Sequence, residues 1–132
     1  MKRSLTLAVA ILVSFLTTFA VAQTSKPTVP KIDAEQFDAL RQKPNTVVLD
    51  VRTPQEFAQG HVPGAVNMDI SDPTFRKKLG ALDKSKTYLV HCESGVRSNR
   101  AVNMMSSLGL SGLFDYHGGF RDWKKQGKPV EK

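Results

Sequence analysis

Cys92 is the only cysteine of the chain, and the residues around it are of types that stabilise a thiolate. A short apolar run ends at His91, a loop containing Gly95 follows, and a helical pattern opens at Ser98. The dipole of a helix N-terminus, unpaired backbone amides and the guanidinium of Arg97 all favour a negative charge at this position. We therefore predict that Cys92 is a nucleophile in an anion-binding loop. The alternative is a buried structural thiol, because free cysteine packs well as a small hydrophobe.

The start of the chain has the pattern of a secretory signal peptide. A basic start is followed by an uncharged, mostly apolar stretch, and Ala20-Val21-Ala22 matches a small-x-small cleavage site. The alternative is an uncleaved membrane anchor, since the uncharged stretch is almost long enough to span a bilayer. The predicted organisation is a signal peptide over residues 1–22, a linker over 23–31 and one folded domain over 32–128. We expect a periplasmic or secreted protein with no membrane attachment after cleavage.

Cysteine count and charge exclude several classes of function. A single cysteine leaves no internal disulfide and no resolving thiol, which excludes a C-x-x-C dithiol oxidoreductase. Loss of residues 1–22 removes Lys2 and Arg3 and no acidic residue, so the formal net charge falls from +7 to +5. The basic residues are scattered without aromatic interleaving, which argues against a nucleic-acid partner. The charge supports a modest attraction for small anionic substrates.

The elements that must position Cys92 alternate between short strands and helices. Capping-box patterns at Asp33/Gln36 and Thr53/Glu56 open two short helices, and Asp72-Pro73 opens a third. Apolar runs predict strands over 46–49, 65–68, 87–91 and 113–116, and the spacing of apolar residues predicts a helix over 98–108. This alternation predicts an α/β fold with a central parallel sheet and helices on both faces. Active groups gather at the carboxyl ends of such strands, where Asp50, Cys92 and His117 are expected.

Four ordered motifs resemble the single-domain rhodaneses, over about Ile32 to Lys125. The motifs are Val48-Leu49-Asp50-Val51-Arg52 with Glu56-Phe57, Gly60-His61-Val62-Pro63-Gly64-Ala65-Val66-Asn67, His91-Cys92-Glu93-Ser94-Gly95-Val96-Arg97-Ser98, and Gly118-Gly119-Phe120-Arg121-Asp122-Trp123. With the predicted signal peptide, the chain is similar to the small exported rhodaneses of bacterial periplasms. The resemblance implies the rhodanese fold.

The resemblance also implies sulfur transfer without a metal or an organic cofactor. The Cys92 thiolate would take the outer sulfur of a small anionic donor such as thiosulfate, and cyanide or a thiol would accept it from the Cys92 persulfide. The backbone amides of Glu93, Ser94, Gly95, Val96 and Arg97 would hold the anionic sulfur. Gly95 would supply a left-handed backbone, and Arg97 would either brace the loop or bind the donor.

Two alternatives to a sulfurtransferase remain open at this point. Phosphatases and arsenate reductases of the same fold also carry a Cys-to-Arg loop, but their loop is one residue longer than the four residues between Cys92 and Arg97. The shorter loop favours a sulfur atom over a tetrahedral oxyanion. A persulfide sensor or sulfur carrier needs the same cysteine, and turnover would distinguish it from a catalyst.

The remaining polar residues favour structural roles. Asp50 is expected to cap a strand end, and Arg52 to pair with Glu56. Glu93 would repel a dianionic donor if its side chain faces the pocket. The three histidines are isolated and predict no metal site. His61 is expected to anchor a turn, and His91 to pack neutral on a buried strand, with a positive neighbour of the thiol as its alternative role. A place at the pocket rim is the alternative, and not the favoured, interpretation of His117. A monomer is expected for a domain of this size.

Overall fold

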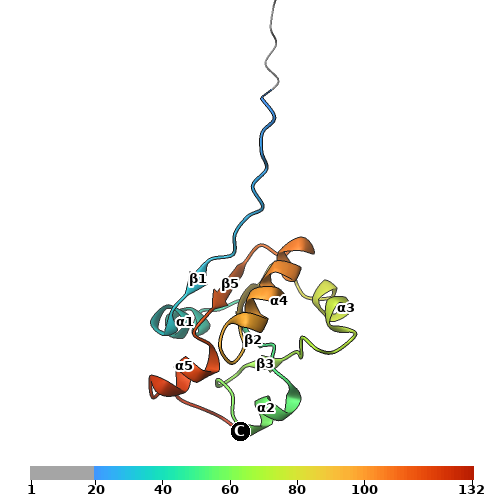
Figure 1. Ribbon diagram of the computed structural model, residues 1–132. Helices are drawn as coiled ribbons and strands as arrows, with labels where there is room; N and C mark the ends of the chain where they lie inside the picture. The colour runs from blue at the N-terminus through green and yellow to red at the C-terminus, as the bar shows by residue number, and fades with distance from the viewer. Residues whose placement is uncertain (1–19) are drawn as a thin grey trace, which may run out of the picture.

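The computed structural model describes residues 20–132, in which a five-stranded parallel sheet forms the centre of the domain (Figure 1). The strand order is β1-β5-β4-β2-β3, and every neighbouring pair is parallel. The strands are β1 (Lys31–Ile32), β2 (Thr46–Asp50), β3 (Val66–Asn67), β4 (Thr87–His91) and β5 (Leu113–Tyr116). The predicted parallel α/β sheet is confirmed. The strand β1 was not predicted, and it begins inside the segment expected to be a linker.

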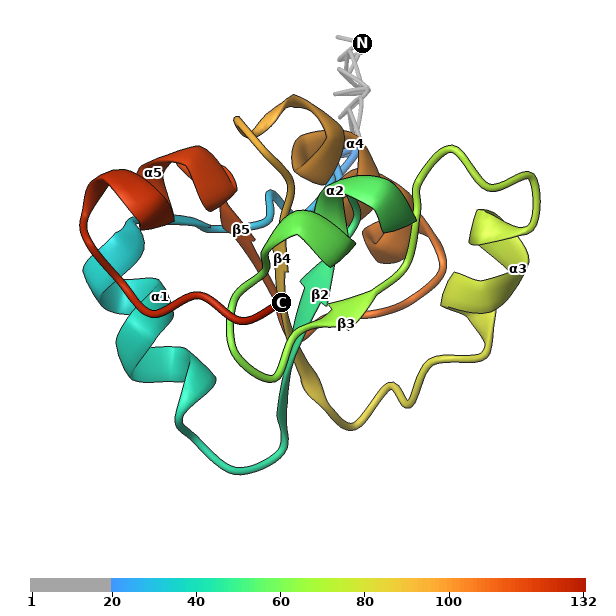
Figure 2. The same cartoon turned by 90° about the horizontal axis from the view of Figure 1, so that it is seen from below.

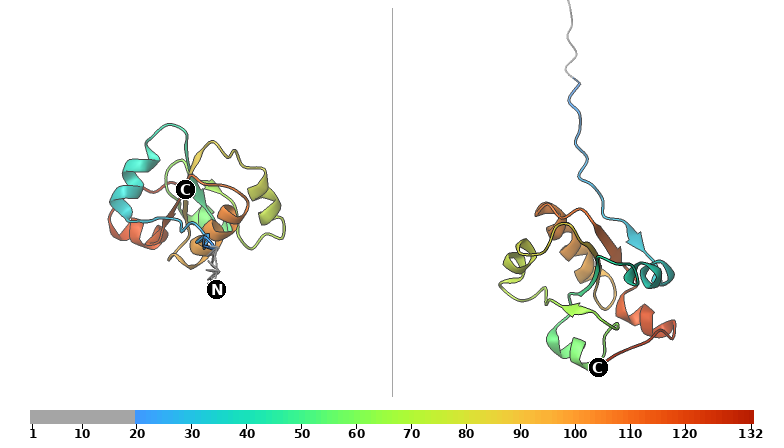
Figure 3. Two further views of the ribbon diagram at one scale, coloured as in Figure 1. Left: turned by 90° about the horizontal axis from the view of Figure 1, so that it is seen from above. Right: turned by 180° about the vertical axis from the view of Figure 1, so that it is seen from behind.

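Helices cover both faces of the sheet, as predicted (Figure 2). One face carries α1 (Ala34–Arg41) and α5 (Gly119–Lys125), and the other carries α3 (Phe75–Gly80) and α4 (Val96–Ser107). The short helix α2 (Pro54–Gln59) lies beside β3 at the end of the sheet where the strands finish. Seen from behind, the segment before β1 runs away from the domain (Figure 3).

The central strand β4 explains why the sheet is buried on both sides. Its side chains alternate between two apolar clusters, with Leu89 packed towards α1 and α5 and Val90 packed towards α4. Both residues are fully buried. A strand without a polar face is stable only inside a sheet that is covered on both faces. This burial fixes the end of β4, which is where Cys92 follows.

Local capping signals were correct for α1 and α2. The side chain of Asp33 accepts from the Gln36 amide, and that of Thr53 accepts from the Glu56 amide, each within a complete capping box. These motifs are read correctly because both partners lie within one helical turn.

Three boundaries differ from the prediction. Helix α4 begins at Val96 rather than Ser98, which places Arg97 in its first turn. Helix α3 begins at Phe75, because the Asp72 side chain accepts from the amide and hydroxyl of Thr74 and forms a turn ahead of the helix. The strand expected over 65–68 is reduced to Val66–Asn67.

The two ends of the chain extend beyond the predicted domain. The tail after residue 128 packs back on the domain: Glu131 and His61 exchange backbone hydrogen bonds, and Trp123 Nε1 donates to the Pro129 carbonyl over 2.7 Å. Nearly all of the predicted signal peptide lies outside the described residues. Within residues 20–132, no helix is long and apolar enough to cross a membrane.

Candidate active site

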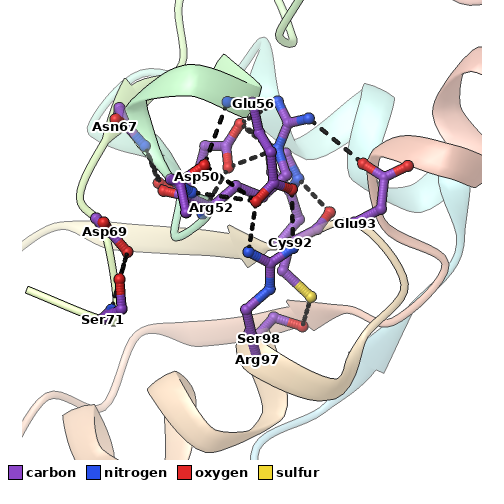
Figure 4. A network of polar contacts seen from close by, with 12 residues as sticks. Asp50, Arg52, Glu56, Asn67, Asp69, Ser71, Cys92, Glu93, Arg97 and Ser98 are labelled. Atoms are coloured by element: carbon purple, nitrogen blue, oxygen red, sulfur yellow. Dashed lines mark hydrogen bonds and ion pairs between the residues drawn. The ribbon is translucent and has the colours of Figure 1, made fainter.

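Cys92 lies directly after β4 and beneath the N-terminus of α4. Only 1% of the residue is exposed. Its Sγ accepts a hydrogen bond from the Gly95 amide over 3.1 Å, and the Ser98 hydroxyl lies 3.7 Å away (Figure 4). A helix N-terminus and an amide donor both stabilise negative charge on sulfur. The structure therefore places Cys92 in the predicted loop at a helix N-terminus, but the side chain is buried there, as the alternative of a buried thiol expected.

Gly95 is required by both the backbone and the packing of the loop. Its φ of +97° lies in the left-handed region, as predicted, and it is the N-cap of α4. A Cβ at this position would collide with the carbonyl oxygen of His117. No larger residue fits without moving the loop or the end of β5.

The turn at Gly118-Gly119 has a role that sequence reasoning missed. Gly119 has φ of +68°, and a Cβ there would collide with the backbone of Glu93 and come within 2.8 Å of the Cys92 carbonyl oxygen. The amide of Phe120 donates to the Cys92 carbonyl over 2.8 Å, and that of Arg121 donates to the Glu93 carbonyl over 3.1 Å. Backbone amides at the start of α5 thus fix two carbonyl groups of the Cys92 loop by hydrogen bonds. The available signal for this role was the double glycine of the fourth motif.

Arg97 is held by Glu56 in a bidentate ion pair. Its Nη1 and Nη2 lie 2.8 Å and 2.9 Å from the two carboxylate oxygens, and about a third of each side chain is exposed. Hydrogen bonding from the guanidinium lowers the pKa of Glu56 from 4.5 to about 2, against the opposing effect of burial. The predicted pairing of Glu56 with Arg52 was therefore wrong, because the side chain turns towards a residue distant in sequence.

Arg52 pairs instead with Asp50 and is almost completely buried. Its Nε and Nη2 contact the carboxylate at 2.8–3.1 Å, and Nη2 also donates to the Gly60 carbonyl over 2.8 Å. The guanidinium carbon lies 4.1 Å from the ring centroid of Phe120. A buried charge with this many partners has a structural role, which agrees with the general prediction for Asp50 and Arg52.

A mixed-charge cavity of about 340 Å³ lies next to the loop, and Glu93 lines it. The Glu93 carboxylate is 3.4 Å from Nη1 of Arg52, which partly compensates its charge. Ser94 and Val96 are exposed, with 70% of Val96 accessible. The cavity is lined by Arg52, Glu56, Gln59, Gly60, Glu93, Phe120, Lys124 and Val130.

His91 takes the buried place predicted for it, whereas His117 does not line the cavity. His91 is fully buried, and desolvation lowers its pKa although Asp50 opposes the shift, so the ring is neutral. His61 stacks on Phe57 with ring centroids 3.8 Å apart, and His117 is exposed. Within the described part of the chain, no three His, Cys, Asp or Glu side chains gather as a metal-binding group.

Ser98 and Asp115 are two further polar residues at the site that sequence reasoning did not select. Ser98 Oγ donates to Asp115 Oδ1 over 2.7 Å, and both residues are buried. The available signal was an acid on the apolar strand Leu113-Phe114-Asp115-Tyr116, two residues after Leu113 and therefore on the same core-facing side.

Comparison with known proteins places the chain in a family. A rhodanese-like domain model matches residues 33–126. The chain is 36% identical to thiosulfate sulfurtransferase 16 of Arabidopsis thaliana, over 63% of this chain and 78% of that protein. It is 34% identical to the thiosulfate:glutathione sulfurtransferase of Saccharomyces cerevisiae, over 64% of this chain and 68% of the relative. The chain spans between 51% and 94% of the length of the curated relatives it matches.

The fold comparison agrees with the sequence comparison. A rhodanese-related protein of Thermoplasma volcanium has a TM-score of 0.70 and 35% identity, over 77% of this chain and 97% of that one. With the glycine-shaped loop around Cys92 and the match over residues 33–126, the chain belongs to the rhodanese-like domain family, which includes sulfurtransferases.

Proposed function

We propose that this protein is a sulfurtransferase that works through a persulfide on Cys92. The Cys92 thiolate attacks the outer sulfur of thiosulfate or a similar donor. A new sulfur–sulfur bond forms, the bond within the donor breaks, and sulfite leaves with the electron pair of that bond. Cyanide or a thiolate then attacks the terminal sulfur of the persulfide and releases Cys92 as a thiolate.

The observation that carries this proposal is the position of Cys92 Sγ at the start of α4, where it accepts from the Gly95 amide. The α4 dipole and this amide stabilise the anionic sulfur in the thiolate and in the persulfide. We propose that the other loop amides, from Glu93 to Arg97, donate hydrogen bonds to the outer sulfur of the persulfide, which extends beyond Sγ. The four-residue span from Cys92 to Arg97 favours this small ligand over a phosphate.

Of the two roles left open for Arg97, its ion pair with Glu56 favours bracing the loop. A guanidinium held at 2.8–2.9 Å by two carboxylate oxygens has little freedom to follow a substrate. Hydrogen bonding to Glu56 raises the pKa of Arg97, so the guanidinium keeps its positive charge beside the loop. We propose that Arg97 supports the loop and its charge balance rather than binding the donor directly.

The mixed charges of the cavity favour a thiol as one of the two substrates. Glu93 faces this cavity, and it disfavours a dianion more than a thiol-bearing molecule that carries charges of both signs. Lys124 supplies a positive group in the same lining. The activity named for the yeast relative, a thiosulfate:glutathione sulfurtransferase, is consistent with a thiol acceptor.

We also propose export to the periplasm or the cell exterior, on the basis of the signal-peptide pattern at residues 1–22. The protein is proposed to act as a monomer on small molecules, with no nucleic-acid partner.

The direct test is the mass of the intact reduced protein after incubation with thiosulfate, beside Cys92→Ser. We expect the gain of one sulfur atom, its removal by cyanide as thiocyanate, and no gain in the variant. A single round of labelling without turnover would instead indicate a sensor or carrier. Failure to accept sulfur from thiosulfate or from a persulfide donor, together with hydrolysis of an aryl phosphate, would refute the sulfurtransferase assignment.

A further inference from the structure

A continuous buried polar chain connects Cys92 to a carboxylate on β5. Cys92 Sγ lies 3.7 Å from Ser98 Oγ, which lies 2.7 Å from Asp115 Oδ1. The exposed fractions of Cys92, Ser98 and Asp115 are 1%, 0% and 1%. The three residues come from the end of β4, the first turns of α4 and the middle of β5. Their neighbours are apolar side chains of the cluster that includes Val90, Ala101, Val102 and Leu113.

The hydroxyl of Ser98 has one proton, and its neighbours determine where that proton points. Its shortest contact is with Asp115 Oδ1, at 2.7 Å, compared with 3.2 Å to the Gly95 carbonyl. When Ser98 donates to Asp115, its lone pairs are free to accept from the Cys92 thiol. This arrangement suits a neutral thiol and a charged carboxylate. A thiolate facing the same lone pairs would be repelled.

The second carboxylate oxygen of Asp115 favours the opposite arrangement, in which the carboxyl group carries the proton and Cys92 is a thiolate. Oδ2 is buried and has no hydrogen-bond partner. A buried carboxylate that keeps a single donor is costly to maintain as an ion, whereas a carboxylic acid in the same place carries no charge. With a proton on Asp115, its O–H donates to Ser98 Oγ and the Ser98 hydroxyl turns to donate to the Cys92 thiolate. Both hydrogen bonds of the chain are then kept, with their directions reversed.

We propose that Asp115 is a positioning residue that takes up the Cys92 proton through Ser98, so that thiol and carboxyl share one proton in the resting protein. The thiol proton passes to Ser98 Oγ while the Ser98 proton passes to Asp115 Oδ1. One S–H bond breaks, one carboxyl O–H bond forms, and the net charge is unchanged. This inference rests on the proposed use of Cys92 as a nucleophile, and it names the group that receives the proton when the thiolate forms.

The other charged groups near the series Cys92–Ser98–Asp115 are already paired or exposed. Arg97 is held by Glu56. Lys31, the register partner of Asp115 on β1, is exposed, and no ion pair joins the two among the residues the structure describes. The titratable groups near the site are Asp50, Arg52 and Glu93 in one ion-paired group, the buried His91 and the exposed His117. The elements that carry Cys92, Ser98 and Asp115 also hold the exposed Arg100 and the buried Tyr88 and Tyr116. These groups are unchanged in the variants below, so any titration step that they cause would persist there.

The test is the ultraviolet absorbance of the thiolate as a function of pH, with Cys92→Ser as the baseline. We expect two steps in the wild-type protein, because the pair loses its shared protons one at a time and its second charge is repelled by the first. Asp115→Asn should show a single step. Asp83→Asn, which changes an exposed carboxylate outside the site, should keep both steps.

Two further measurements separate a proton acceptor from a merely structural carboxylate. The infrared band of a protonated carboxyl should be present after the first step and absent in Asp115→Asn. Ser98→Ala should reduce the thiolate absorbance gained in the first step, and Ser98→Thr should restore it. These variants also decide the question if Asp115→Asn fails to fold.

The proposal is overturned if wild-type protein and Asp115→Asn titrate with the same number of steps, or if the infrared band persists in the variant. Sulfur transfer is not used in this assay. Two steps without sulfur transfer would therefore refute the proposed function alone, and sulfur transfer with one step would refute the role of Asp115 alone.

Discussion

Replacement of Glu56 by Gln tests whether the ion pair with Arg97 stabilises the loop. Gln retains the length of the side chain and can still form the capping box of α2, as Gln36 does in α1. The change therefore removes the charge opposite Arg97 and little else. It isolates a contact between two residues that are 41 positions apart in sequence.

The structure gives the size of the expected effect. Arg97 lowers the pKa of Glu56 from 4.5 to about 2, which for a fully buried group would correspond to roughly 3 kcal/mol at neutral pH. The two side chains are 30% and 34% exposed, so solvent screening reduces this figure to about 1 kcal/mol. We expect Glu56→Gln to lower the melting temperature by roughly 4–8 °C at pH 7.

The pH dependence provides a second check on the same reasoning. Because the folded-state pKa of Glu56 is lowered, the stabilisation is fully present above pH 4.5 and is lost as the pH falls towards 2. The difference in unfolding free energy between wild type and Glu56→Gln should therefore be largest near neutral pH and shrink below pH 4.5. Urea unfolding at a series of pH values measures it.

The control is Glu35→Gln, which removes an exposed acid from the first turn of α1. Glu35, like Glu56, lies in the first turn of a helix, but Glu35 has no ion pair among the described residues. The loss of stability in Glu35→Gln should therefore be smaller than that in Glu56→Gln. Equal stability losses for both variants, or a Glu56→Gln loss that does not change with pH, would refute the argument that the Arg97 pair is responsible.

Three further predictions concern the site and its supports. Glu93→Gln should raise kcat/KM with thiosulfate by roughly three- to tenfold, because about 1 kcal/mol of repulsion is removed, and an unchanged value in steady-state assays would contradict a pocket-facing charge. Gly95→Ala should abolish activity and strongly destabilise the protein, whereas Gly64→Ala, with φ of +77° and open space around it, should cost only about 1–2 kcal/mol in urea unfolding. Burial and donation to Asp122 raise the pKa of Tyr116 above 10.0, so unfolding free energy should fall above pH 10 in the wild type and less steeply in Tyr116→Phe.

The parts of the fold that the sequence predicted correctly depend on contacts between close residues. The buried strand over 87–91 carries Tyr88, Leu89 and Val90 in succession, and the capping boxes of α1 and α2 are complete within four residues. The edge strand Lys31–Ile32 was missed because two residues carry no periodicity. The start of α4 was placed late because Val96, a β-branched and exposed residue, follows a glycine cap rather than a side-chain cap.

The site was predicted less completely because its polar partners come from distant segments. Cys92 and Gly95 could be selected from one loop. The pairing of Arg52 with Glu56 was inferred from their separation of four residues, yet Arg52 turns inward to Asp50 and Glu56 crosses to α4. The contact between Glu56 and Arg97 is decided by which segments the sheet brings together, and no local spacing encodes it.

The backbone contacts between α5 and the Cys92 loop have a consequence for biosynthesis. A ribosome adds Cys92 well before Phe120 and Arg121. The amides of these two later residues donate to the carbonyls of Cys92 and Glu93 at the start of the loop. The nascent chain therefore carries an ordinary thiol until its last helix has been made and has docked. A polypeptide that stops before Gly118 contains the nucleophile and its glycine but lacks the groups that give the loop its shape.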